Sequence, residues 1–224
     1  MDSDPLPLGT QPEPDPDNAG VGSDMVILRT AALRFVLRFV FSKGETMKRT
    51  KTLALCRGGI AVALALALSY LKIPVGAGFG GSVDFVMLPL IVFAALEGTL
   101  WGVGAGFVFG VLKYFLGSGF GINWVSILLD YSIAYAAVGI AGLFGKRLSL
   151  GALCGCAARF AVHFISGITV YASYMPEEFL GLRMGSVWLY SLLYNGTYML
   201  PNTVAAVIIC VLLNKPVARW TERR

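Results

Sequence analysis

Few ionisable or amide side chains interrupt the long apolar stretches of this sequence. Lys113, Asp130 and Asn195 stand in three different stretches, and Asp84 stands at the start of another. A charge inside lipid costs about 2.5 to 3.5 kcal/mol on insertion scales, so such residues are retained mostly where they function. The pattern predicts a polar site enclosed by membrane-spanning helices.

A second set of polar positions follows a helical period. Arg159, His163, Gly167 and Tyr171 recur every four residues, so on a helix they form one ladder along one face. One interpretation is a pocket for a small molecule, to which the last apolar stretch adds aromatic and amide groups. The other is an ion pair between Asp130 and Arg159 that holds the helices together.

The composition requires lipid as the solvent for most of the chain. Of 224 residues, 56% are apolar and only 14% are charged, with a mean hydropathy of +0.71, whereas soluble proteins average about 25% charged residues. The apolar runs are about 20 residues long, which favours spanning helices over barrel strands. A cytosolic enzyme and a disordered protein are both excluded.

Six apolar stretches predict an all-α integral membrane protein, a bundle of six transmembrane helices. The second stretch is short, so we expect it to tilt or to span only partly. The stretches cover approximately residues 53–71, 83–96, 100–116, 124–144, 150–171 and 187–213.

Basic residues predict the orientation of this bundle. They cluster before the first stretch, between the fourth and fifth, and after the sixth, which is one side of the membrane if there are six spans. The other side has only Lys72 and Arg183 in its loops. The positive-inside rule therefore puts both termini in the cytoplasm, and the net charge of +8 from Met47 onward reflects topology, not nucleic-acid binding.

The N-terminal 46 residues are expected to lie outside the six-helix domain of residues 47–224. Residues 1–24 hold five of the ten prolines and six of the thirteen acids, a composition typical of disorder. Residues 25–46 are compatible with an interfacial amphipathic helix. Alternatively the codons of Lys43-Gly44-Glu45 form a ribosome-binding sequence and translation starts at Met47.

Small residues mark close helix packing. Gly98, Gly102, Gly106 and Gly110 fall four apart in the third stretch, and Gly151 and Gly155 repeat the spacing in the fifth. Such faces allow neighbouring backbones to approach closely in lipid.

The sequence contains no motif for catalysis, for ATP hydrolysis or for a metal cofactor. Gly145-Lys146 lacks the first glycine and the Ser or Thr of a phosphate-binding loop. Cys154 and Cys156 are two apart and point in different directions on a helix, so small-hydrophobe packing is expected for the cysteines. We therefore expect a protein that is not an enzyme.

Three separated segments resemble the thiamine-specific substrate-binding (S) components of energy-coupling factor vitamin transporters. They are LLDY at 128–131, RFAVHFISGITVYASY at 159–174 and VWLYSLLYNGTYMLP at 187–201. The resemblance covers about residues 53–213 and implies a six-helix bundle in a bacterial plasma membrane. It also implies high-affinity capture of thiamine from the extracellular side.

The resemblance further implies the residues that bind the vitamin. The carboxylate of Asp130 would contact the aminopyrimidine ring, with Tyr131 beside it. The other implied ligand contacts are Arg159, His163, Gly167, Tyr171, Tyr190 and Asn195, with Phe79, Phe109 and Phe120 as aromatic walls.

Three positions depart from the family pattern. The family often has Glu where this chain has Asp130, Lys where it has Arg159, and Trp where it has Tyr171. The departures leave a thiamine precursor or another vitamin open as the ligand.

The resemblance finally implies partners: a transmembrane coupling protein and two ATP-binding subunits, with the first helix docking through Ala61 and Ala65. The Gly-rich loop from Lys72 to Ser82 would close over the ligand, or alternatively would be a passive linker. The remaining alternative is a stand-alone carrier that needs no such module.

Overall fold

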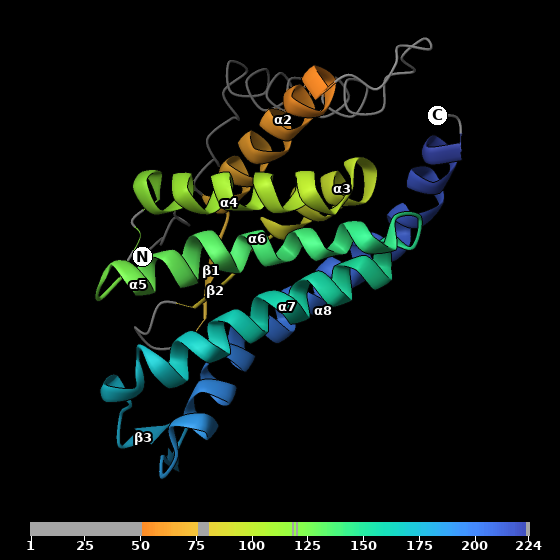
Figure 1. Ribbon diagram of the computed structural model, residues 1–224. Coiled ribbons are helices and arrows are strands. Elements are labelled where there is room, and N and C mark those ends of the chain that lie inside the picture. Colours follow the sequence, from red (N-terminus) through yellow and green to blue (C-terminus); the bar gives the residue numbers. More distant parts are fainter. Residues whose placement is uncertain (1–50, 76–80, 118, 120, 223–224) are drawn as a thin grey trace, which may run out of the picture. The chain divides into compact units, whose positions relative to one another are not determined.

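The computed structural model describes residues 51–75, 81–117, 119 and 121–222, which are mostly helical (Figure 1). Contacts divide the chain into residues 1–45 and 46–224, and the fold belongs to the second unit. The expectations for the N-terminal 46 residues lie outside the described part. The helices are α2 (Lys51–Ser69), α3 (Met87–Glu97), α4 (Thr99–Leu116), α5 (Trp124–Ile127), η1 (Leu128–Ile133), α6 (Ala134–Val138), η2 (Gly139–Phe144), α7 (Leu148–Thr169), η3 (Ala172–Tyr174) and α8 (Val187–Glu222).

All six predicted apolar segments are helical in this structure. Five of them, namely α2, α4, the continuous helix from Trp124 to Phe144, α7 and α8, are long and apolar enough to cross a membrane. The remaining segment is α3, the second along the chain. It has 11 residues, fewer than the roughly 20 that a span needs. The all-α membrane fold is therefore confirmed, and so is the shortness of the second segment.

Glycines let α4 pack closely on the following helix. A Cβ added at Gly106 or Gly110 would overlap the backbone carbonyls of Tyr135 and Tyr131. The predicted glycine face is confirmed for these residues and for Gly102. Gly98 differs, because it separates α3 from α4 at a φ of 100°, where glycine is favoured over other residues.

The helix from Trp124 to Phe144 changes its winding along its length. Asn123 caps it by accepting a hydrogen bond from the Ser126 amide at 2.9 Å. Residues Leu128–Ile133 then form a π-helix, which contains Asp130. Such wide turns are rare and occur frequently at functional sites.

Helices α7 and α8 lie side by side (Figure 1). The last helix continues to Glu222, beyond the expected end at Leu213. Asn214 explains part of this extension, because its side chain donates to the Ser149 hydroxyl at 3.0 Å and accepts from the Ser149 amide at 3.3 Å. The beginning of α7 thus holds the last turns of α8.

Two short hairpins complete the described fold. The first pairs β1 (Ile73–Pro74) with β2 (Ser82–Val83) between α2 and α3. The second pairs β3 (Glu178–Phe179) with β4 (Leu182–Arg183) between α7 and α8. Residues 76–80 of the expected closing loop lie outside the described part of the chain.

Candidate ligand-binding site

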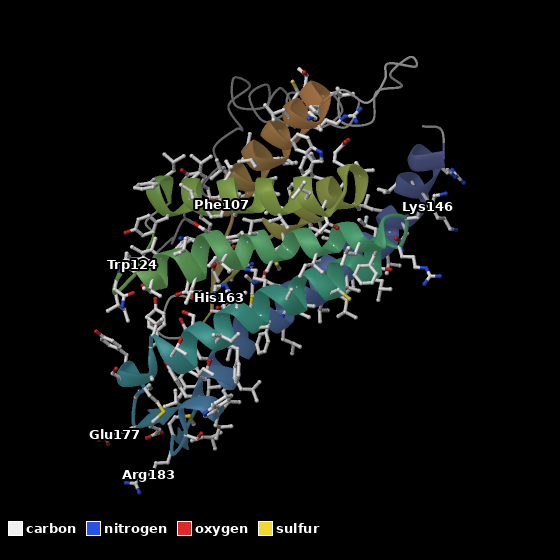
Figure 2. All side chains as sticks on the ribbon, in the orientation of Figure 1. Phe107, Trp124, Lys146, His163, Glu177 and Arg183 are labelled. Atoms are coloured by element: carbon white, nitrogen blue, oxygen red, sulfur yellow. The ribbon has the colours of Figure 1, made fainter. Side chains whose placement is uncertain are left out.

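An Asp–His pair joins the π-helix η1 to the middle of α7, where Figure 2 shows His163. Oδ1 of Asp130 lies 3.2 Å from Nδ1 of His163, and the two side chains are 17% and 10% exposed. The other ring nitrogen of His163, Nε2, is buried and has no hydrogen-bond partner among the described residues. Because buried polar atoms are normally satisfied, Nε2 is available to a ligand.

Tyr171 brings a third predicted residue to this pair. It follows the end of α7, and its hydroxyl lies against the carboxylate of Asp130 and the hydroxyl of Ser126. Burial raises the pKa of Tyr171 above its usual value, and the negative charge of Asp130 raises that pKa further. Tyr171 is therefore a neutral hydrogen-bonding group at pH 7.

Asn195 of α8 is held beside the same pair. Its Nδ2 donates to the carbonyls of Ser191 at 2.9 Å and of His163 at 3.4 Å. Its Oδ1 accepts from the Tyr198 hydroxyl at 2.7 Å. A Cβ at Gly167 would overlap the Ser191 side chain, so this glycine permits α7 and α8 to meet here.

Arg159 lies one helical turn before His163 on α7. It does not form the ion pair with Asp130 that was one of the two interpretations of the sequence. Its Nη2 donates to the Tyr135 hydroxyl at 3.0 Å, and its guanidinium carbon lies 4.1 Å from the centre of that ring. The expected ion pair between Asp130 and Arg159 is not formed, because Asp130 contacts His163 instead. The Nε and Nη1 atoms of Arg159 are buried without a hydrogen-bond partner among the described residues.

Lys113 meets Arg159 at the same tyrosine. Its Nζ donates to the Tyr135 hydroxyl at 2.5 Å and to Oδ2 of the buried Asp84 at 3.4 Å. The Asp84 amide in turn donates to Oδ1 of Asn202 at 2.8 Å. Two cations thus share the Tyr135 hydroxyl as acceptor, and one of them, Lys113, also reaches a carboxylate.

Three predicted aromatic residues lie around this centre. Tyr190 is buried against Phe179 and Tyr194. Phe109 is fully buried and contacts the Tyr135 ring edge-on at 4.6 Å, and Tyr131 contacts Tyr114 at 5.4 Å. Phe79 and Phe120 lie outside the described residues.

The two alanines expected to dock a partner face the interior of the chain. Ala65 is fully buried and Ala61 is 8% exposed, because this side of α2 packs on α3 and α4. Docking through Ala61 and Ala65 would need this packing to open, and it stays a prediction. The small residues of α2 that stay exposed are Gly59, Ala63 and Ala67, again four apart.

Sequence reasoning missed several residues that organise the site. Ser126, Tyr135, Ser191 and Asn202 are ordinary hydroxyl and amide residues in apolar helices, and only their contacts distinguish them. The sequence did contain a signal for Asn202. Like Asn195, it is an amide in an apolar stretch, and the same reasoning could have identified it.

The fold defines a multi-pass helical membrane protein, and this polar centre is its candidate binding site. The thiamine transporter protein model (Thia_YuaJ) matches residues 55–221, and the chain belongs to this family. The resemblance seen in the sequence is thereby confirmed.

Comparison with individual proteins supports the same family. The thiamine transporter ThiT of Bacillus subtilis is 32% identical over 150 residues, which are 59% of this chain and 75% of the relative. The thiamine transporter ThiT of Lacticaseibacillus paracasei is 30% identical over 173 residues, covering 69% and 83%. A solved structure of ThiT from Listeria monocytogenes superposes with a TM-score of 0.66 at 21% identity, over 76% of this chain and 98% of that one, so the fold is shared.

Proposed function

We propose that this chain is a thiamine-binding membrane subunit that captures the vitamin from the extracellular side. The observation that carries this proposal is the partly buried Asp130–His163 pair with an unused ring nitrogen, in a member of the thiamine transporter family. Thiamine combines a hydrogen-bonding aminopyrimidine with a permanently charged thiazolium ring. A carboxylate suits the first ring and aromatic faces suit the second.

Each residue then has a role toward the ligand. Asp130 accepts a hydrogen bond from the exocyclic amine of the aminopyrimidine, and Nε2 of His163 and the Tyr171 hydroxyl provide further hydrogen bonds. Asp130 is one methylene shorter than the Glu common in the family, yet it reaches His163 at 3.2 Å. Tyr171 remains neutral beside it, because burial and the carboxylate both raise its pKa.

A titration tests the proposal directly. Purified protein in detergent is titrated with thiamine while the fluorescence of its tryptophans is recorded. Asp130→Asn removes the charge and keeps the shape, so we expect a Kd about 10- to 150-fold higher, as for the loss of a hydrogen bond to a charged group. Glu178→Gln, in the exposed β3–β4 hairpin, is the matched control. Folded wild-type protein that does not bind thiamine would overturn the proposal.

A related ligand is the second candidate. The changes at Asp130, Arg159 and Tyr171 relative to the family pattern favour testing a thiamine precursor or another vitamin. Competition against bound thiamine separates these ligands, because the true ligand displaces the others at the lowest concentration.

We also propose that both termini are cytoplasmic. Lys146, Arg147, Lys215 and Arg219 gather at one end of the helices, whereas exposed aromatic residues gather at the other. Cytoplasmic loops are rich in Lys and Arg, and aromatic residues mark membrane interfaces. The aromatic residues are Tyr70, Phe115, Trp124, Tyr174 and Trp188.

Transport itself is proposed to depend on a separate energising module of the energy-coupling factor type, a coupling protein with two ATP-binding subunits. The absence of an ATP-hydrolysis motif in the sequence supports this proposal. The exposed small-residue face of α2, Gly59, Ala63 and Ala67, is the surface we assign to the coupling protein. Vesicles containing this chain alone should bind thiamine without accumulating it, whereas a stand-alone carrier would move it across.

A further inference from the structure

The short strand β2 is bonded along both of its edges, although its hairpin has only two strands. On one edge it pairs with β1, with Val83 opposite Ile73. On the other edge Oδ1 of Asn202 accepts from the Asp84 amide at 2.8 Å, and Nδ2 donates to the Ser82 carbonyl at 2.9 Å. Alternate residues of a strand direct their backbone groups to the same edge. One amide side chain of α8 therefore takes the place of a neighbouring strand.

Burial makes this pairing necessary. Asn202 and Asp84 are 2% and 4% exposed, and a buried backbone group without a partner is costly. Nδ2 of Asn202 also donates to the carbonyl of Tyr198, one turn earlier on α8, at 2.8 Å. This third bond fixes the orientation of the amide. The side chain of Asn202 thus holds β2 at a defined place on α8.

Tyr198 meets β2 at a second point and also reaches the polar centre. A Cβ added at Gly81, just before β2, would lie 2.6 Å from Cδ1 of the Tyr198 ring. The hydroxyl of Tyr198 donates to Oδ1 of Asn195 at 2.7 Å, and its ring contacts the His163 ring edge-on at 6.1 Å. A continuous series of contacts therefore runs from β2 through Tyr198 to two residues of the candidate site.

We propose that Asn202 and Tyr198 are positioning residues, through which β2 acts as a fixed support for the binding site. Asn202 holds β2 against the ring of Tyr198, and Tyr198 in turn fixes Asn195 and His163 in the geometry that the ligand meets. This inference rests on the proposed function and deepens it. A site that is held in place before binding loses less conformational freedom when the ligand arrives, so it binds more tightly.

The first experiment removes the amide and measures thiamine binding to the purified protein. Asn202→Leu deletes the bonds to β2 at similar volume, so we expect a Kd about tenfold higher, chiefly through faster dissociation. Asn214→Leu is the matched control, because Asn214 also lies on α8 and bonds through both amide atoms, in its case to Ser149. The control should lower the unfolding temperature and leave the Kd unchanged. An unchanged Kd in Asn202→Leu, or equal increases in both variants, would overturn the inference.

A double-mutant cycle tests the path through Tyr198, and it decides the question if Asn202→Leu does not fold. Gly81→Ala presses on the Tyr198 ring, whereas Tyr198→Phe removes only the bond to Asn195. Each change alone should raise the Kd. Together they should raise it by less than the product of the two single factors, because moving the ring matters less once its hydroxyl bond is gone.

Gly185→Ala, with nothing within 4 Å of the added methyl group, is the control for Gly81→Ala and should leave the Kd unchanged. Factors that multiply independently in the double variant would overturn the inference. Wild-type protein that does not bind thiamine would instead overturn the proposed function itself.

Discussion

At the scale of single residues, Tyr135 is the hydrogen-bond acceptor shared by Lys113 and Arg159. Tyr135→Phe removes that acceptor and leaves two cationic donors, one of them buried, less satisfied. A hydrogen bond to a charged group is worth about 1.5 to 3 kcal/mol, so we expect a clearly lower thermal unfolding temperature in detergent. Tyr174→Phe, whose ring is exposed, is the control. Equal unfolding temperatures for the two variants would contradict this role.

A second prediction for a single residue concerns Gly167, where α7 meets α8. Gly167→Ala places a methyl group on the Ser191 side chain, which neighbours the Asn195 amide. Overpacking of this kind typically costs about 1 to 3 kcal/mol, and we expect much of that cost to appear as a higher Kd for thiamine. Gly196→Ala, where nothing lies within 4 Å, should leave the Kd unchanged. A fall in stability with unchanged affinity would refute the connection to the site.

Polar residues in apolar stretches could be recognised in the sequence because lipid makes them costly. Asp130, His163 and Asn195 were predicted on this ground, and the structure brings them together. Their individual bonds could not be predicted. Arg159 bonds to Tyr135 and not to Asp130, since the choice depends on the relative depth of three side chains on two helices.

At the scale of helices, the glycine face of α4 allows a paired test. Gly106→Ala would force a Cβ into the Tyr135 carbonyl, so we expect strong destabilisation or a failure to fold. Gly104→Ala lies on the same helix with open space around it and should be neutral or slightly stabilising. Unfolding temperatures of the purified variants provide the comparison, and equal behaviour would exclude close backbone packing as the reason for the glycine.

Helix α2 offers a second test at this scale. Ala63→Trp enlarges the exposed small-residue face, so we expect it to abolish thiamine uptake in cells and to leave binding to the purified subunit intact. Ala65→Trp enlarges a fully buried position, so it should lower stability and binding together. Normal uptake by Ala63→Trp would place the docking surface elsewhere.

The apolar runs predicted where the helices lie along the chain. They did not predict how each helix is wound or which of its faces is covered. The π-turn around Asp130 has no signature in Leu128–Ile133, because the apolar pattern of six residues does not distinguish i→i+5 from i→i+4 hydrogen bonds. The exposed face of α2 could not be predicted either. Ala61 and Ala65 alternate with Ala63 and Ala67, and the neighbours of α2 decide which pair is covered.

At the scale of the whole molecule, orientation can be tested by labelling. In a chain with its four native cysteines replaced, Leu180→Cys should react with a membrane-impermeant maleimide in intact cells. Lys146→Cys, at the opposite end of the bundle, should react only after the membrane is opened (Figure 2). The reverse pattern of labelling would show the opposite orientation.

The sequence by itself determined the solvent, the number and approximate limits of the helices, and most of the polar residues of the site. These follow from local physics, because an apolar run must be buried in lipid and a charge within it must have a reason to remain. Only the tertiary structure decided which polar groups pair and which face of α2 is exposed. Those choices depend on the rotation and depth of one helix against another, which distant residues set through packing.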